Sequence, residues 1–228
     1  MKKITVLISD DHSIVRAGLR ALLEAGGEFL VVGEATNGQQ AVQEARRLRP
    51  DVALLDLAMP LLNGVEAARQ IVQEVPATKV LVLSAYNDDQ HLRQALQAGV
   101  TGYLVKETAA DDLLLAVREA AHGNAFFSPS IGRRLLTQWR GSLPNAKPAK
   151  TDPASLTRRQ TEVFQLIAEG YMTKQIAGVL SLTIKTVEKH RESLMRKLDM
   201  HNIAALTRHA IFTGTIESGA GPLGAFAA

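Results

Sequence analysis

Five short apolar segments, each followed by an amphipathic stretch, constrain the fold of this chain more than any other feature. The apolar segments are Ile4–Ser9, Leu30–Glu34, Val52–Asp56, Lys79–Ser84 and Gly102–Val105. The stretches with helical periodicity are Ile14–Ala25, Gly38–Arg47, Gly64–Glu74, Asp89–Ala98 and Ala110–His122. Val52–Leu55 and Val80–Leu83 are apolar throughout, as expected for strands that are covered on both faces. The repeated strand–helix order predicts an α/β domain with a parallel sheet and helices on both sides.

The second half of the chain shows helical patterns without strands. Residues 126–152 form an expected linker, with a candidate helix over 131–139 and linker-like composition over Gly141–Lys150. Helical patterns separated by short turns occupy residues 153–214, and the Gly- and Ala-rich residues 215–228 predict a flexible tail. We therefore expect an α/β domain over 1–125 and a smaller all-α domain after the linker.

The formal net charge of +3 conceals two halves of opposite sign. Residues 1–125 contain 12 Lys/Arg and 16 Asp/Glu, a net of −4, whereas residues 126–228 contain 14 and 7, a net of +7. The basic half is a candidate for binding a polyanion, although ordinary surface charge explains the same numbers. The absence of cysteine excludes disulfides and thiolate chemistry. The lack of cysteine and the lack of an apolar run long enough to span a membrane together favour a cytoplasmic protein.

Polar residues stand at the carboxyl ends of four of the expected strands. They are Asp10 and Asp11 after the first, Asp56 in the third, Ser84 in the fourth and Lys106 after the fifth. In parallel α/β sheets, ligands bind beyond these ends. Carboxylates brought together repel one another unless a cation lies among them, and Mg²⁺ binds both carboxylates and phosphate oxygens. The pattern predicts a Mg²⁺ site where a carboxylate attacks phosphorus while lysine and serine stabilise the phosphoryl oxygens.

Each of these residues has a simpler interpretation when it is taken alone. Asp10 or Asp11 could cap the following helix, and Asp56, Ser84 and Lys106 could be ordinary strand-end or surface residues. The occurrence of all five at successive strand ends favours a ligand site. The same cluster would also serve a small Mg²⁺-dependent phosphohydrolase with Asp10 or Asp56 as its nucleophile.

Four segments together resemble the receiver domain of two-component response regulators, over about residues 3–123. These segments are Ile8–His12, Asp56–Gly64, Leu83–Ala85 and Gly102–Lys106. The resemblance implies a flavodoxin-like (βα)5 fold with strand order 2-1-3-4-5. It also implies that Asp56 accepts a phosphoryl group from a sensor histidine kinase, and that the chain is not an enzyme beyond its own phosphorylation and dephosphorylation.

The same resemblance implies a set of Mg²⁺ ligands. Asp11 would bind the ion directly and Asp10 through water, while Asp56 and the backbone carbonyl of Ala58 would complete the protein ligands. Position 58 departs from the family, because larger side chains are common there. A small residue at this position implies more open access to Asp56.

The resemblance further implies that Ser84 and Lys106 contact the phosphoryl group. Tyr103 would be the aromatic switch residue, whose ring turns inward when Ser84 moves towards the phosphate. Without the resemblance, Tyr103 is interpreted as a half-buried strand aromatic. Glu107 follows Lys106 where many receivers have proline, and the family often has a cis peptide bond at this place. A non-proline cis bond costs about 3–4 kcal/mol.

The helical half contains the pattern of a helix-turn-helix. Thr157 and Gln160 predict a capping box at the start of one helix. Thr173 should cap a short second helix, and after a tight turn Thr183 should cap a longer helix over Ile184–Leu198. This longer helix has an apolar face and a charged outer face, as in a DNA-binding helix-turn-helix. A generic three-helix bundle with a solvated charged face would show the same periodicity.

Five further segments resemble the LuxR-type DNA-binding domain, over about residues 153–214. They are Leu156–Phe164, Lys174–Ala177, Lys185–Arg191, Met195–Leu198 and His201–Leu206. Together with the receiver-like segments, they give the chain a resemblance to the NarL/FixJ class of response regulators. The resemblance implies a phosphorylation-dependent transcriptional regulator that binds double-stranded DNA as a homodimer, with Asn202–Phe212 as its dimerisation helix. An alternative is a DNA-binding regulator whose phosphorylation pocket is vestigial.

By this resemblance, Ile184–Leu198 is the recognition helix in the major groove. The candidates to face base edges are Lys185, Glu188, Lys189 and Glu192. The candidates for phosphate contacts are Lys174, Arg191, Arg196 and Lys197, and Thr183 and Thr186 complete the candidate DNA-binding set. Gln160, Glu188 and Ile203 depart from residues that are frequent in the family. Glu188 could accept a hydrogen bond from a cytosine amino group or repel phosphate.

Overall fold

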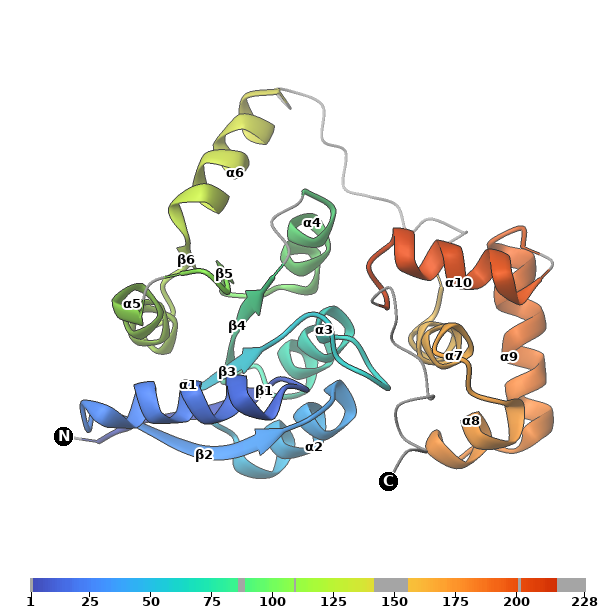
Figure 1. Ribbon diagram of the computed structural model, residues 1–228, viewed down its shortest axis with the longest axis horizontal. Coiled ribbons are helices and arrows are strands. Elements are labelled where there is room, and N and C mark those ends of the chain that lie inside the picture. The colour runs from blue at the N-terminus through green and yellow to red at the C-terminus, as the bar shows by residue number, and fades with distance from the viewer. Residues whose placement is uncertain (1, 86–88, 109, 142–155, 201, 217–228) are drawn as a thin grey trace. The chain divides into compact units, whose positions relative to one another are not determined.

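The chain forms two compact units in the computed structural model, Met1–Asn145 and Ala146–Ala228, and each has its own core (Figure 1). The structure describes residues 2–85, 89–108, 110–141, 156–200 and 202–216. The linker-like residues 142–152 and the tail from 217 onwards lie outside the described residues. Among the described residues, no helix combines the length and apolar character needed to cross a membrane.

The first unit contains a six-stranded parallel sheet in the order β2-β1-β3-β4-β5-β6 (Figure 1). The strands are β1 (Ile4–Ser9), β2 (Phe29–Ala35), β3 (Val52–Leu55), β4 (Lys79–Ser84), β5 (Gly102–Val105) and β6 (Phe126–Phe127). The first five strands confirm the expected 2-1-3-4-5 order. The sequence did not predict β6, which pairs with β5, because two residues are too few to show a strand pattern.

Helices cover both faces of this sheet, as its continuously apolar strands require. They are α1 (Ser13–Ala25), α2 (Gly38–Leu48), α3 (Gly64–Glu74), α4 (Asp89–Ala98), α5 (Ala110–Ala121) and α6 (Pro129–Gly141). Alternate strand residues form two cores. Leu7 and Leu55 pack with residues of α2, α3 and α4, whereas Ile8 and Leu54 pack with α1 and α5. The sheet therefore has a filled core on each side, and its carboxyl edge is left to hold polar residues.

Helix α6 belongs to the first unit and lies against the α4 side of the sheet. Its Ile131 is fully buried in the same core as Leu92 of α4 and Tyr103 of β5. The Arg134 guanidinium donates a hydrogen bond to the Asp89 carboxylate at the start of α4, with the Nη1 and Oδ1 atoms 3.2 Å apart. The candidate helix over 131–139 is thus longer than expected and is anchored to α4.

The second unit is all-helical, with α7 (Arg158–Ala168), α8 (Thr173–Val179), α9 (Ile184–Lys197) and α10 (Ile203–Phe212). Helix α7 packs against the other three, and the core between them is formed by apolar side chains that are fully buried or nearly so: Val163, Leu166, Ile176, Val187, Leu194 and Leu206. The predicted capping box is present. The Thr157 hydroxyl accepts from the Gln160 backbone N–H, and the Gln160 side chain accepts from the Thr157 N–H.

The expected cap at Thr173 is wrong, because α8 begins at Thr173 itself and Met172 is its N-cap. The side-chain oxygen of Gln175 accepts a hydrogen bond from the Met172 backbone N–H, at 2.8 Å. A glutamine at the third helical position can satisfy this N–H from inside the helix, so the cap residue needs no acceptor of its own. By contrast, Thr183 caps α9 as predicted and accepts from the Thr186 N–H.

Candidate functional site

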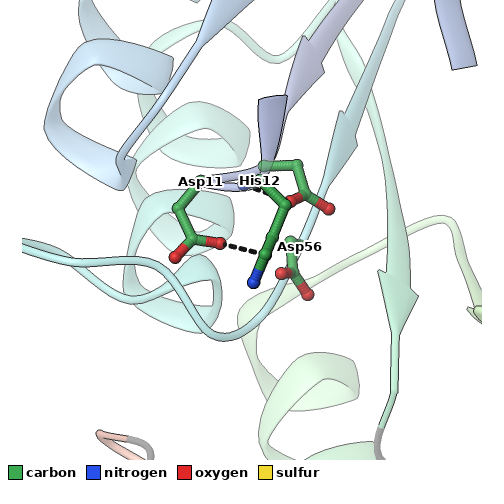
Figure 2. Close-up of side chains that lie close together, drawn as sticks. Asp11, His12 and Asp56 are labelled. Atoms are coloured by element: carbon green, nitrogen blue, oxygen red, sulfur yellow. Dashed lines mark hydrogen bonds and ion pairs between the residues drawn. The ribbon is translucent and has the colours of Figure 1, made fainter. Parts of the chain in front are cut away.

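The carboxyl edge of the sheet brings three aspartates together (Figure 2). Strands β1 and β3 are adjacent, so Asp10 and Asp11 at the end of one lie beside Asp56 at the end of the other. One ligand atom from each aspartate and one from His12 all lie within 4.8 Å of one another. Asp10 and Asp56 are 1% and 4% exposed, whereas Asp11 and His12 are open to solvent. This donor set fits a hard divalent cation, which is bound through oxygen ligands.

Lys106 joins the two buried aspartates. Its Nζ lies 2.9 Å from an oxygen of Asp10 and 2.9 Å from an oxygen of Asp56. Burial raises the pKa of the Asp56 carboxyl to about 6, and the hydrogen bond from Lys106 limits the rise. Burial opposes the charge of Lys106, but hydrogen bonds to Asp10 and Asp56 raise the pKa of its ammonium group. Three carboxylates and one ammonium leave a net charge of −2, which a divalent cation would neutralise.

The backbone around Asp56 is closely packed. The Asp56 N–H donates to the Ser9 carbonyl at 2.8 Å, and the Gly64 N–H donates to the Leu57 carbonyl at 2.8 Å. A Cβ atom at Gly64 would lie 1.9 Å from the Asp56 carbonyl oxygen, so only glycine fits there. Asn63 caps α3 by accepting from the Glu66 N–H at 2.9 Å. The start of α3 therefore holds the Asp56 loop in place.

The interpretation of Asp10 or Asp11 as a helix cap is wrong. Both residues precede His12, which is the N-cap of α1 and makes no side-chain capping bond. The Asp10 carboxylate instead accepts the His12 backbone N–H at 2.8 Å, and this bond fixes the turn that leads out of β1. The two carboxylates are thus left to face the pocket.

Ser84 and Tyr103 are both fully buried. Ser84 ends β4 beside Val105 of β5, and Tyr103 lies in the core on the α4 side. The interpretation of Tyr103 as a half-buried strand aromatic is therefore wrong, since its ring is directed inward. The described residues contain no cis peptide bond, so Lys106 and Glu107 are joined by a trans bond in this structure.

Arg16 is a site residue that the sequence did not reveal. Its Nη1 donates to the backbone carbonyls of Asp10 and Asp11, at 2.8 and 3.3 Å. Its Nε bonds to Glu34 of β2 at 3.1 Å, and Arg20 bonds to the same carboxylate at 2.7 Å. The hydrogen bond from Arg20 holds the pKa of Glu34 below its ordinary value, and Arg16 acts in the same direction. In the sequence, Arg16 is simply a charged residue on an amphipathic helix, and its partners lie in other segments.

The outer face of α9 carries most of the candidate DNA-binding residues, both those expected at base edges and those expected at phosphates. The exposed members are Lys185, Glu188, Lys189, Glu192 and Arg196, whereas Arg191 and Lys197 are half-buried. Lys174, at the start of α8, is also exposed. The Thr183 and Thr186 hydroxyls lie 2.8 Å apart and bond to each other, so both take part in capping the helix. Their contact with DNA, and the choice of base or phosphate by the others, remain predictions.

Two protein families match this chain. Residues 6–118 match the response regulator receiver domain, and residues 154–210 match the bacterial regulatory proteins of the luxR family. The regulatory protein LiaR of Bacillus subtilis is 40% identical over 197 residues, which cover 86% of this chain and 92% of LiaR. The response regulator VraR of Staphylococcus aureus is 37% identical over 199 residues, covering 87% and 92%.

Solved structures agree with these matches. The RcsB response regulator of Salmonella typhimurium has a TM-score of 0.60 at 28% identity, covering 93% of this chain and 99% of that one. A structure of RcsB with DNA has a TM-score of 0.55 at 28% identity, covering 91% and 98%. The receiver fold, its acidic edge and the helical second unit define a response regulator of a two-component system. Within that class, the chain belongs to the NarL/LuxR family of DNA-binding transcriptional regulators.

Proposed function

We propose that phosphorylation of Asp56 switches the DNA binding of this regulator on. The observation that supports this role is the buried Asp56 carboxylate, held 2.9 Å from Lys106 beside a second buried aspartate. One Asp56 oxygen attacks the phosphorus of a phosphohistidine on a sensor kinase. The P–N bond breaks, its electron pair stays on the imidazole nitrogen, and that nitrogen takes up a proton. The product is an aspartyl phosphate, which water later hydrolyses.

The other pocket residues have supporting roles in this proposal. Asp11, Asp56 and the Ala58 carbonyl would hold Mg²⁺, with Asp10 bound through water. When bound, the ion would offset negative charge on the phosphoryl oxygens. The Lys106 ammonium, already 2.9 Å from Asp56, moves onto a phosphoryl oxygen, and the Ser84 hydroxyl donates to another. These contacts stabilise the charge that Asp56 alone could not hold in a buried site.

The signal would leave the pocket through the core on the α4 side. Movement of Ser84 towards the phosphoryl group changes the space available next to β5, and the ring of Tyr103 reorients in response. Tyr103 shares its core with Ile131 of α6, and Arg134 ties α6 to α4. A shift at β4 and β5 therefore changes the packing of α4 and α6 together. The surface over about residues 85–122 changes with it.

At the DNA, we propose that two copies of α9 enter the major groove at two half-sites, with α10 as the dimerisation helix. RcsB, which has been solved as dimers bound to DNA, supports this arrangement. Lys185, Glu188, Lys189 and Glu192 would face base edges. Phosphate contacts would come from Lys174, Arg191, Arg196 and Lys197, and Thr183 and Thr186 would lie near the DNA at the start of α9. Because the DNA of bacteria lies in the cytoplasm, we propose the same location for this member of a bacterial regulator family.

The phosphorylation step can be tested with isotope-labelled acetyl phosphate and Mg²⁺. The wild-type chain should become labelled, and Asp56→Asn should not. Asp111→Asn is a matched control, because Asp111 is an exposed aspartate on α5. It should be labelled like the wild type. Undiminished labelling of Asp56→Asn would refute the proposed acceptor.

Two alternative functions make different predictions in the same assays. A phosphohydrolase would turn over phosphomonoesters continuously, whereas a response regulator should show only the slow loss of its own label. A regulator with a vestigial pocket would bind DNA equally with and without acetyl phosphate. The salt bridges of Lys106 to both Asp10 and Asp56 favour a working pocket over a vestigial one.

A further inference from the structure

We propose that His12 is an additional ligand of the cation site, which raises its affinity for transition ions that bind imidazole, such as Co²⁺, Ni²⁺ and Zn²⁺, but not for Mg²⁺. The inference rests on the proposed function, since it assumes that the pocket of Asp10, Asp11 and Asp56 binds a divalent cation. Neither the sequence pattern nor the family resemblance assigned a role to His12. The structure places it among the carboxylates (Figure 2).

The His12 ring already faces the ligand atoms. Its Nδ1 lies 2.7 Å from an oxygen of Asp11 and 3.3 Å from an oxygen of Asp10. Ligand atoms that share one ion are at most roughly 4 Å apart, because each lies about 2.1 Å from it. The four candidate ligand atoms of the site lie within 4.8 Å of one another. A small contraction therefore brings the atoms of Asp11, His12 and Asp56 to a common ion, with Asp10 still bound through water.

The backbone of His12 is fixed while its side chain is free to adjust. The backbone N–H donates to the Asp10 carboxylate at 2.8 Å, and the backbone carbonyl accepts from the Arg16 N–H at 3.1 Å. The side chain is 63% exposed, so the imidazole can rotate and an ion can enter from solvent. Only the side-chain torsions need to be ordered on binding, which keeps the entropic cost of adding this ligand small.

The chemistry of the added ligand determines which ions benefit. A neutral imidazole adds no charge to the net −2 of the three aspartates and Lys106, so it does not strengthen the attraction for every divalent ion equally. Mg²⁺ prefers oxygen ligands and keeps its waters, whereas imidazole suits the later transition ions. His12 should therefore widen the gap between Co²⁺ and Mg²⁺ affinity beyond what the carboxylates alone produce.

Calorimetric titration of the full chain with Mg²⁺ alone and with Co²⁺ alone tests this inference. In His12→Ala, Co²⁺ affinity should fall roughly tenfold or more, while Mg²⁺ affinity changes by less than about twofold. The visible absorption of bound Co²⁺ should change as well, because a nitrogen ligand is replaced by water. His122→Ala removes an exposed histidine at the end of α5 and should match the wild type for both ions.

A second variant separates ligation from positioning. The amide of His12→Gln can still hydrogen-bond to Asp11 but is a poor ligand for Co²⁺, so it should behave like His12→Ala. Restored Co²⁺ affinity in His12→Gln, or an equal loss for both ions in His12→Ala, would mean that His12 only positions Asp11 and would overturn the inference. If Mg²⁺ binds the wild type and the Co²⁺ preference is unchanged by His12→Ala, this inference alone fails. If neither ion binds the wild type, the proposed Mg²⁺ site fails with it.

Discussion

At Asp56, the requirements of stability and of function conflict. It is 4% exposed, and its burial raises its pKa from 3.8 to about 6. A raised pKa means that the folded protein favours the neutral form, so the contribution of Asp56 to stability is fully present below pH 3.8, falls as the pH rises from there, and is lost above pH 6. Near neutral pH the protein therefore keeps a charged nucleophile in place at the expense of its own stability.

Replacing this carboxyl by an amide should stabilise the first unit when no cation is bound. From the shift to about 6, Asp56→Asn should gain about 3 kcal/mol of unfolding free energy at pH 8 and roughly half of that at pH 5. Urea denaturation in EDTA, followed by circular dichroism at both pH values, measures this difference. Asp111→Asn, on the surface, should change little. A variant that is less stable than the wild type at pH 8 would contradict the argument.

At single residues, sequence reasoning succeeded where chemistry and strand position coincide. Asp10, Asp11, Asp56 and Lys106 were expected together because parallel strands end at one edge, and the structure brings them together. Contacts between side chains of different segments leave no such pattern. Arg16 and His12 were missed for this reason. Thr173 was assigned as a cap on residue type alone, but Gln175 satisfies the backbone N–H from within α8.

At the level of elements, α1 and β2 form a support for the pocket through Arg16. This side chain does not belong to the expected ligands, yet it donates to the carbonyl oxygens of Asp10 and Asp11 and is held by Glu34. Groups that orient the ligands of a metal site commonly contribute 10- to 100-fold to its affinity. The Mg²⁺ affinity of the pocket should therefore depend on a helix that does not touch the ion.

Arg16→Ala should weaken Mg²⁺ binding by about tenfold or more. Arg20→Ala is the matched control, because Arg20 reaches Glu34 but not the Asp10 or Asp11 carbonyls in the described contacts. Its effect should be clearly smaller. Calorimetric titration with Mg²⁺ measures both variants. Equal affinities for Arg16→Ala and the wild type would show that the turn after β1 holds its shape without this side chain.

Helices α8 and α9 should divide the work of DNA recognition between position and sequence. Lys174→Ala should weaken binding to all sequences alike and lower the slope of log affinity against log salt by about one. Glu188→Gln should leave that slope nearly unchanged or slightly steeper. It should instead alter the preference at one base pair, by about 1–3 kcal/mol of binding free energy. Fluorescence anisotropy at several salt concentrations, with single base-pair variants of the operator, distinguishes the two. A sequence-specific effect of Lys174→Ala would argue against a phosphate contact.

For the whole molecule, the opposite charges of the two halves suit their separate tasks. In the proposed function, the acidic half would hold a cation and a phosphoryl group, and the basic half would bind a polyanion. The order of the first five strands, the capping box at Thr157 and the bounds of α9 followed closely from the sequence, since each depends on local periodicity. The sixth strand and the anchoring of α6 depend on tertiary contacts, so no local sequence pattern predicted them.

Phosphorylation should also change the state of association. With acetyl phosphate and Mg²⁺, the full chain should shift from monomer to dimer, and its affinity should rise for DNA with two half-sites about 10 base pairs apart. Affinity for a single half-site should rise less, because dimerisation offers it no second contact. Analytical ultracentrifugation and anisotropy measure these two effects. Asp56→Asn should show neither, and a dimer that forms equally in this variant would separate association from phosphorylation.

The short strand β6 bears on how this receiver behaves in isolation. Its backbone pairs with β5, where Phe126 N–H bonds to the Thr101 carbonyl at 3.3 Å and Ser128 N–H to the Tyr103 carbonyl at 3.2 Å. These bonds cover an edge that would otherwise be open to pairing with another sheet. A fragment cut at residue 125 would lose both this cover and the buried Ile131 of α6, and it would tend to aggregate. A fragment that ends near residue 141 keeps both, and is therefore the better choice for solution work on the receiver alone.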